Sequence, residues 1–257
     1  MSKAIKPLTN EQLKAKAPSL FTSEPHFEVS DKYHFIPTID VIEEIRFHNW
    51  YPVSVAVANV RDEEKEGFQQ HCVRFRHFED LLNPKDNAVE LLLFNSHDRS
   101  KAFSISAGIF RFVCANGLVI SDSVFEAYKI KHLGERDNDV ANAVANITSI
   151  KPKLMQKIEK LESITLNQSE KESFAKSSIP LRFEEHLEIN HNDLLIPHRF
   201  EDSKNDLYTV LNVIQENLLR GNISGINKDT KRKFTSKEIT SISKDTDVNK
   251  GLWEIAE

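Results

Sequence analysis

The sequence is poor in cysteine, which secreted and disulfide-stabilised proteins use heavily. Its 257 residues include two cysteines, Cys72 and Cys114, too few to form a disulfide framework. Each lies in an apolar, strand-like run, where a free thiol behaves as a small hydrophobic side chain. We therefore expect a protein that works in a reducing cytoplasm.

Long apolar runs are also missing. The longest, residues 89–94, contains Glu90 and is far shorter than the roughly 20 residues that a membrane-spanning helix needs. The N-terminal residues include lysines, but the apolar core of a secretory signal does not follow them. The sequence predicts neither membrane insertion nor secretion.

Glycine is scarce, and motifs that mark common catalytic sites are absent. The seven glycines form neither Gly-x-x-x-x-Gly-Lys-Ser/Thr nor Gly-x-Gly-x-x-Gly, and Gly-x-Ser-x-Gly is missing too. His71, Cys72, His97, Asp98 and Cys114 are of types that bind zinc, but they lack the closely paired spacing of zinc sites. We expect no catalytic residue, metal or cofactor.

What the sequence does contain is enough apolar and charged residues for a folded chain. Hydrophobic residues make up 39% and charged residues 28%, and the net charge is -5. A chain of this length can bury a substantial core. Because the whole chain does not attract phosphate, any nucleic-acid surface has to be a local basic patch.

The hydrophobic periodicity predicts an α+β fold in which long helices pack on an antiparallel sheet. Residues 1–30 lack a sustained period, and we expect a loose arm with a short helix at 10–15. Residues 31–257 are predicted to form a single domain. Its parts are a helix at 38–49, a sheet core over about 50–135 and a helical part over about 137–257.

Alternating β-branched and aromatic residues predict the strands, and three- and four-residue apolar spacing predicts the helices. A tight turn is expected at Ala115-Asn116-Gly117, a helix end at Gly221, and docking of Trp253 on the core. The predicted strands are 51–60, 72–78, 89–94, 102–109, 110–114 and 118–120, and the predicted helices are 139–166, which Pro152 kinks or divides, and 206–220.

Basic residues in the predicted sheet alternate with aromatic ones. Arg74 and Arg76 lie on one strand, and Arg111 lies between two phenylalanines on another. A sheet with one cationic face suits contact with the backbone of a nucleic-acid strand. The aromatic residues are then either core or base-stacking platforms.

A second polar group lies on the helix at 206–220. Asn212, Glu216 and Arg220 line up at four-residue intervals, which indicates either a routine stabilising ion pair or a binding edge. Six basic residues against two acidic ones follow between Lys228 and Lys244. The predicted nucleic-acid contacts are Arg74, Arg76, Arg111, Arg199, Asn212, Gln215, Glu216, Arg220, Arg232 and Lys233.

Several ordered segments resemble the domain-of-unknown-function family 932. They include Arg-x-Val-Cys-x-Asn-Gly-Leu from Arg111 and Gln-Glu-Asn-Leu-x-Arg-Gly from Gln215. The other segments are 33–38, 70–76, 95–98 and Trp253, so that the likeness spans about 33–257. The resemblance implies a phage, prophage or plasmid-like protein in the cytoplasm of a bacterial host cell. The order of elements also resembles RecT-like and Red-beta-like single-strand annealing proteins, by analogy of fold alone.

Three functions are compatible with these observations. The leading hypothesis is a non-enzymatic protein of DNA metabolism or recombination that binds single-stranded DNA, with a homo-oligomer expected. The second is a protein-interaction factor of a phage that binds and inhibits a host defence component. The third is a metal-dependent nuclease built from carboxylates such as Glu201, Asp202 and Asp206.

Overall fold

The structure is a computed structural model, and its contacts divide the chain into two compact units. Unit 1 comprises Met1–Phe112 and Ser123–Lys151, and unit 2 comprises Val113–Asp122 and Pro152–Glu257. The residues described are 6–29, 33, 35–60, 62–85, 87–111, 116–119 and 136–257.

The main feature of unit 1 is a sheet in which strands β1, β2, β3 and β4 are neighbours in that order. The pairs β1/β2, β2/β3 and β3/β4 are antiparallel, which confirms the prediction of an antiparallel α+β fold. These strands are β1 (Trp50–Val57), β2 (His71–His77), β3 (Asn87–Asn95) and β4 (Ser104–Arg111). The short strand β5 (Asn116–Val119) belongs to unit 2.

Two of the predicted strands and the predicted turn require correction. The segments 102–109 and 110–114 were expected as separate strands, but Ser104–Arg111 is one continuous strand. Asn116 and Gly117 begin β5 instead of forming a turn, and Ala115 lies outside the described residues.

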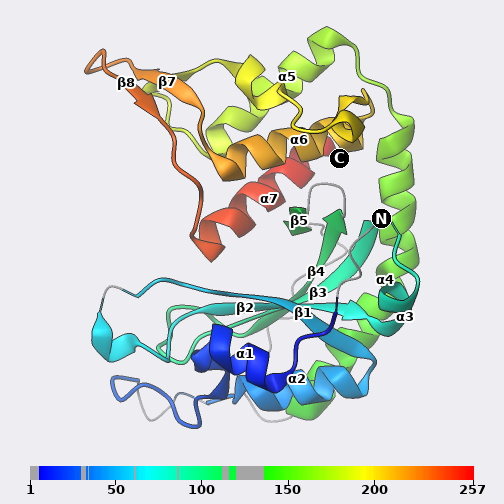
Figure 1. The fold of residues 1–257 in the computed structure, drawn as a ribbon, viewed down its shortest axis with the longest axis vertical. Helices are drawn as coiled ribbons and strands as arrows, with labels where there is room; N and C mark the ends of the chain where they lie inside the picture. The colour runs from blue at the N-terminus through cyan, green and yellow to red at the C-terminus, as the bar shows by residue number, and fades with distance from the viewer. Residues whose placement is uncertain are drawn as a thin grey trace. The chain divides into compact units, whose positions relative to one another are not determined.

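Helices α1 (Asn10–Lys16) and α2 (Thr38–Phe47) lie beside the sheet of unit 1 (Figure 1). In α2 the buried residues Val41, Ile42 and Ile45 form the apolar stripe expected from the sequence. A hydrogen bond between Thr38 and the His71 ring ties one face of the sheet to α2, and one from Trp50 to Thr148 ties it to α4 (Arg136–Ser163).

The described part of the N-terminal segment is packed, and the expectation of a loose arm was wrong for it. A capping box at Thr9 and Gln12 begins α1. Leu13, Ala17 and Leu20 have no exposed surface. Burial of these apolar side chains stabilises the segment against unit 1.

Unit 2 combines helices with a small three-stranded antiparallel sheet in the order β6-β7-β8. Only α4 and α6 were expected here, and Pro152 lies inside α4 without ending it. The elements are α5 (Gln168–Ser178), β6 (Leu187–Ile189), α6 (Leu207–Arg220), β7 (Ser224–Asn227), β8 (Lys233–Thr235) and α7 (Ile242–Ala256). Short helical segments complete the two units: η1 (Pro18–Phe21), η2 (Glu63–Lys65), α3 (Phe78–Leu82), η4 (Ile179–Leu181), η5 (His191–Leu195) and η6 (Phe200–Ser203).

The core of unit 2 lies around α6. Asp206 caps the helix by accepting a hydrogen bond from the Thr209 N–H, and Gly221 ends it with a positive φ of 78°. Leu211 and Ile214 are fully buried, as is Trp253 of α7. The predicted helix end and the predicted burial of the terminal tryptophan are therefore confirmed.

Among the described residues, no helix is both long enough and apolar enough to cross a membrane.

Candidate nucleic-acid interface

The two arginines of β2 are ion-paired to one carboxylate on β3. Arg74 Nε donates to Glu90 Oε2 over 2.5 Å, and a guanidinium nitrogen of Arg76 donates to Glu90 Oε1 over 2.6 Å. Register places Arg76 directly opposite Glu90, and the Arg76 guanidinium also lies 4.6 Å from the centre of the Phe110 ring. Arg76 and Glu90 are 0% and 1% exposed, so Arg76 does not form part of a cationic surface.

Arg111 points to the other face of this sheet. It pairs in register with Asn87, whereas Arg76 pairs with Glu90, three residues further along β3. Side chains alternate along a strand and directly paired residues share a face, so an odd separation puts them on opposite faces. The expectation that Arg74, Arg76 and Arg111 form one exposed cationic face was wrong.

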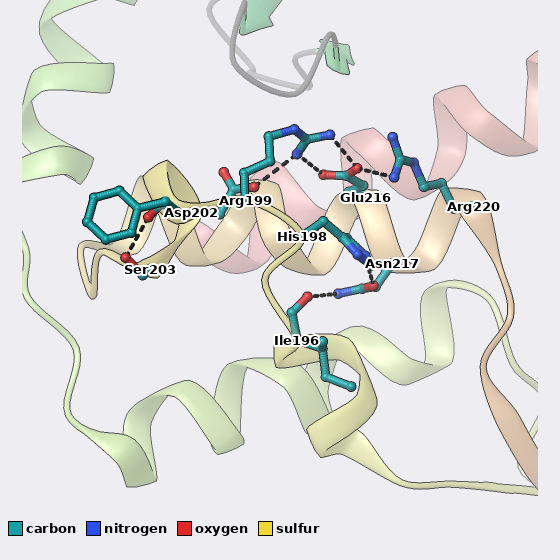
Figure 2. Close-up of polar contacts among 9 residues, drawn as sticks. Ile196, His198, Arg199, Asp202, Ser203, Glu216, Asn217 and Arg220 are labelled. Carbon is teal, nitrogen blue, oxygen red and sulfur yellow. Dashed lines mark hydrogen bonds and ion pairs between the residues drawn. The ribbon is translucent and has the colours of Figure 1, made fainter.

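In unit 2, Arg199 and Arg220 approach a single carboxylate, that of Glu216, from two sides (Figure 2). Arg199 donates to both oxygens of Glu216 at 2.7 and 2.8 Å and to Asp202 at 2.9 Å. These hydrogen bonds to Glu216, followed by those to Asp202, outweigh burial and raise the pKa of Arg199. Arg220 lies 2.8 Å from Glu216.

The loop that carries Arg199 is fastened to α6 next to this cluster. Asn217 Nδ2 donates to the backbone oxygens of Leu194 and Ile196, both at 3.0 Å, and Asn217 Oδ1 lies 2.8 Å from the His198 ring (Figure 2). Bidentate pairing of Arg199 with Glu216 adds to these contacts. The cluster therefore holds the loop on the helix.

Asn212 and Gln215 face inward from α6. Asn212 Nδ2 donates to the Tyr208 backbone oxygen at 2.7 Å, and Gln215 donates to Asn249 of α7. Their exposed fractions are 2% and 0%. The amide side chains of this helix thus pack unit 2 together and do not reach its surface.

Arg232 and Lys233 lie at the surface, on a hairpin formed by β7 and β8. Lys228 and Lys231, which the residue-by-residue prediction missed, are exposed on the same hairpin. We call these four residues the basic hairpin. The hairpin extends away from α5, α6 and α7 of its unit, and is coloured orange in Figure 1. The excess of basic residues from Lys228 onward was the sequence signal that could have identified Lys228 and Lys231.

The turn of the hairpin is shaped by Asn227. Its side-chain oxygen accepts hydrogen bonds from the N–H groups of Asp229 and Thr230 at 3.0 and 2.9 Å, and its own N–H donates to the Arg232 oxygen at 2.9 Å. Lys231 takes a φ of 56°. Of the carboxylates in the described part of the chain, none forms an ion pair with Lys231, Arg232 or Lys233, so these charges remain available to a ligand.

A buried polar network in unit 1 joins residues that the sequence kept far apart. The Thr38 hydroxyl lies 2.9 Å from His71 Nε2, 3.3 Å from His97 Nε2 and 3.0 Å from Asn95 Nδ2, and Ser19 Oγ lies 3.0 Å from His71 Nδ1. All five residues are at most 1% exposed. In the sequence, His71 and His97 stood out only as residues of a type that binds zinc, without the spacing of a zinc site. Their connection through Thr38 was not predicted.

Burial has the largest effect on the pKa of both histidine rings in this network. It lowers the pKa of His71 to about 3, with a further decrease from the neighbouring His97, and it lowers the pKa of His97 to about 4. The two imidazoles are therefore neutral at pH 7, where each can accept one hydrogen bond and donate another.

Two of the three carboxylates considered for a nuclease have other partners. Asp202 is paired with Arg199, and Asp206 caps α6. Within the ranges that the structure describes, no group of three or more His, Cys, Asp or Glu side chains could hold a metal ion.

Taken together, these features describe an α+β protein with a group of four exposed basic residues on one hairpin. The predicted contacts Arg74, Arg76, Arg199 and Arg220 are instead ion-paired within the chain. The sequence matches the family described as "Domain of unknown function (DUF932)" over residues 25–253. UPF0380 protein YafZ and UPF0380 protein YfjQ of Escherichia coli (strain K12) are each 32% identical over 253 residues, covering 98% of this chain and 91% of each relative. The chain therefore belongs to the DUF932 family. No solved structure matches it.

Proposed function

We propose that the protein binds nucleic acid, in the first instance single-stranded DNA, through the basic hairpin. The observation that carries this proposal is the concentration of Lys228, Lys231, Arg232 and Lys233 on an exposed two-stranded projection of an otherwise acidic chain. Phosphate contacts from such side chains supply most of the affinity of sequence-independent binding.

The charge distribution supports the hairpin over the other predicted contacts. Arg76 is buried against Glu90, and Arg199 shares Glu216 with Arg220. Bringing DNA phosphates to those guanidinium groups would require breaking ion pairs in which the carboxylate is almost fully buried, which is costly. Lys231, Arg232 and Lys233 of the hairpin are exposed and need only release counterions, and Lys228 has only a 3.0 Å hydrogen bond to the Glu185 backbone oxygen to exchange.

A role in recombination, such as the annealing of single strands, is part of this proposal. It rests on binding of DNA by the hairpin and on the analogy of element order that the sequence suggested. Four phosphate contacts to a single strand would make the logarithm of the association constant fall with the logarithm of salt concentration with a slope of about -3.

Fluorescence anisotropy with a labelled single-stranded oligonucleotide over a series of salt concentrations tests the proposal. In the variant Lys231→Gln/Arg232→Gln, we expect the slope to fall by about half, because two of four phosphate contacts are lost. The matched control is Lys153→Gln/Lys160→Gln, which removes two exposed lysines of α4 with the same change in net charge.

The control variant is expected to bind as the wild type does. Absence of binding at micromolar protein and low salt would refute the proposed function. Equal salt slopes for the wild type and the hairpin variant would refute the role of the hairpin.

A further inference from the structure

A hollow of about 860 Å³ adjoins the basic hairpin on the small sheet of unit 2. Its volume lies within the range of small-molecule sites in proteins. All three strands contribute to its lining, and Lys233 belongs both to the hollow and to the hairpin. The lining residues that carry the argument are Glu188, Asp193, Ser224, Ile226, Lys233 and Thr235.

Three residues of the lining form a row across the sheet. Register pairs Glu188 with Ile226 and Ile226 with Lys233, so these three residues point to one face. Ile226 lies between the two charged residues and is 40% exposed, so an apolar side chain is open to solvent at the centre of the row. Gly225 and Phe234 also line the hollow, and Phe234 packs over Gly225, where a Cβ would stand 2.7 Å from the ring.

The two ends of this row have opposite charges. Neighbouring strands are about 4.8 Å apart, so the backbones at Glu188 and Lys233 are separated by roughly 10 Å, and the two described side chains form no ion pair. That distance is comparable with the distance from the phosphate of a nucleotide to the far edge of its base. Asp193, fixed by a 3.2 Å hydrogen bond from Asn190, adds a second carboxylate to the acidic end.

From this arrangement we infer that the hollow receives one unstacked base of a single strand whose phosphates lie on the basic hairpin. The inference rests on the proposed function and extends it to base recognition. Lys233 contacts the phosphate, Ile226 supports the flat face of the base, and Glu188 and Asp193 accept hydrogen bonds from its exocyclic amino group.

This chemistry selects among bases. Carboxylates accept hydrogen bonds from the amino group of cytosine, whereas thymine presents a carbonyl oxygen at the equivalent position and is repelled. Duplex DNA keeps its bases stacked and paired, so only a single strand can supply one at low cost. The hollow therefore favours single-stranded DNA that contains cytosine over single-stranded DNA that contains thymine.

The test compares binding of the full chain to oligodeoxycytidylate and oligodeoxythymidylate of equal length. We expect the wild type to bind the cytosine strand about tenfold more tightly. Ser224→Trp, which fills the hollow from β7, should remove this preference. Thr240→Trp adds the same side chain at an exposed position outside the hollow and should preserve the preference.

A second variant distinguishes a specific loss of the cytosine preference from misfolding of Ser224→Trp. Glu188→Lys should raise the affinity for both strands, since it adds a cation, and yet remove the preference for cytosine, a combination that a misfolded protein cannot produce. Equal binding of the two strands by the wild type, or a preference that survives both substitutions, would overturn the inference. In that case, reduced salt slopes in Lys231→Gln/Arg232→Gln would still leave the proposed function standing, whereas absence of any binding would remove both.

Discussion

Glu90 has two cationic neighbours and almost no contact with solvent. Its carboxylate compensates Arg74 and Arg76 on the adjacent strand, and the three residues form a polar centre among the apolar strands of unit 1. Removing one partner of a buried ion pair leaves an uncompensated charge, which is far more costly than losing an exposed pair. The charges of these three residues therefore compensate one another inside the sheet.

The buried histidines make unit 1 sensitive to acid. An unfolded histidine takes up a proton as the pH falls through about 6.5, whereas folded His97 resists protonation down to a pKa of about 4. The unfolded state therefore binds more protons, and the free energy of unfolding falls between these pH values by roughly 3 kcal/mol for this ring. We expect His97→Gln to show a shallower dependence on pH in urea denaturation than the wild type.

The control for this measurement is His186→Gln, which replaces a partly exposed histidine outside the network. It should reproduce the pH dependence of the wild type. An unchanged dependence in His97→Gln would show that the ring is already charged in the folded protein or that the network opens before unfolding.

At the scale of single residues, the sequence revealed which side chains are polar but not where they meet. The alternation around Arg74 and Arg76 was visible, whereas the position of Glu90 opposite Arg76 follows from strand register. Cross-strand pairing likewise decides that Arg111 lies on the other face. Arg232 and Lys233 were correctly expected as accessible because a polar, basic stretch leaves no apolar face to bury.

Among the elements, those with a sustained hydrophobic period were predictable and the others were not. Helix α6 has an apolar residue at every third or fourth position, and the strands of the large sheet alternate. Helix α5 was missed because it buries only Phe174, Ala175 and Ser178. Its capping box, Asn167 with Glu170, is a sequence signal that could have found it. Strands β6, β7 and β8 have three or four residues each, too few to establish a period.

Gly221, which ends α6, is constrained by two separate effects. Its φ of 78° disfavours any other residue, and a Cβ would stand 2.6 Å from the backbone carbon and oxygen of Lys237. We expect Gly221→Ala to lower the free energy of unfolding by about 3 kcal/mol or more. Urea denaturation followed by circular dichroism measures this change.

Gly67 provides the matched comparison. It also has a positive φ, 87°, but nothing lies within 4 Å of the position that an added methyl group would take. Gly67→Ala should therefore cost only the conformational strain, about 1–2 kcal/mol. Equal losses for the two variants would show that strain alone, without the contact to Lys237, accounts for the effect at Gly221.

At the scale of the whole molecule, each unit has its own core and its own fully buried tryptophan. Trp50 lies in unit 1 and Trp253 in unit 2, and the chain has no other tryptophan. Units with separate cores can unfold with different midpoints. The variants Trp50→Phe and Trp253→Phe leave a single fluorescent reporter in one unit at a time.

Adding Glu90→Gln to these two variants tests whether the units unfold separately. The transition reported by Trp50 should shift by about 3 kcal/mol because Arg74 and Arg76 lose their shared charge partner, while the transition reported by Trp253 should shift less. Glu79→Gln, at an exposed carboxylate, is the control and should shift neither. Equal shifts at both reporters would show a single cooperative transition.

The segment 227–233 contains four basic side chains and one acidic side chain and so carries a charge of +3, which leaves -8 for the rest of a chain whose net charge is -5. Such a molecule experiences a torque in the field of a polyanion, since the positive segment is drawn in while the remainder is pushed back. Productive encounters will begin at the positive segment and unproductive orientations will be turned away. Added salt should then act more on the rate of capture than on the lifetime of the captured state.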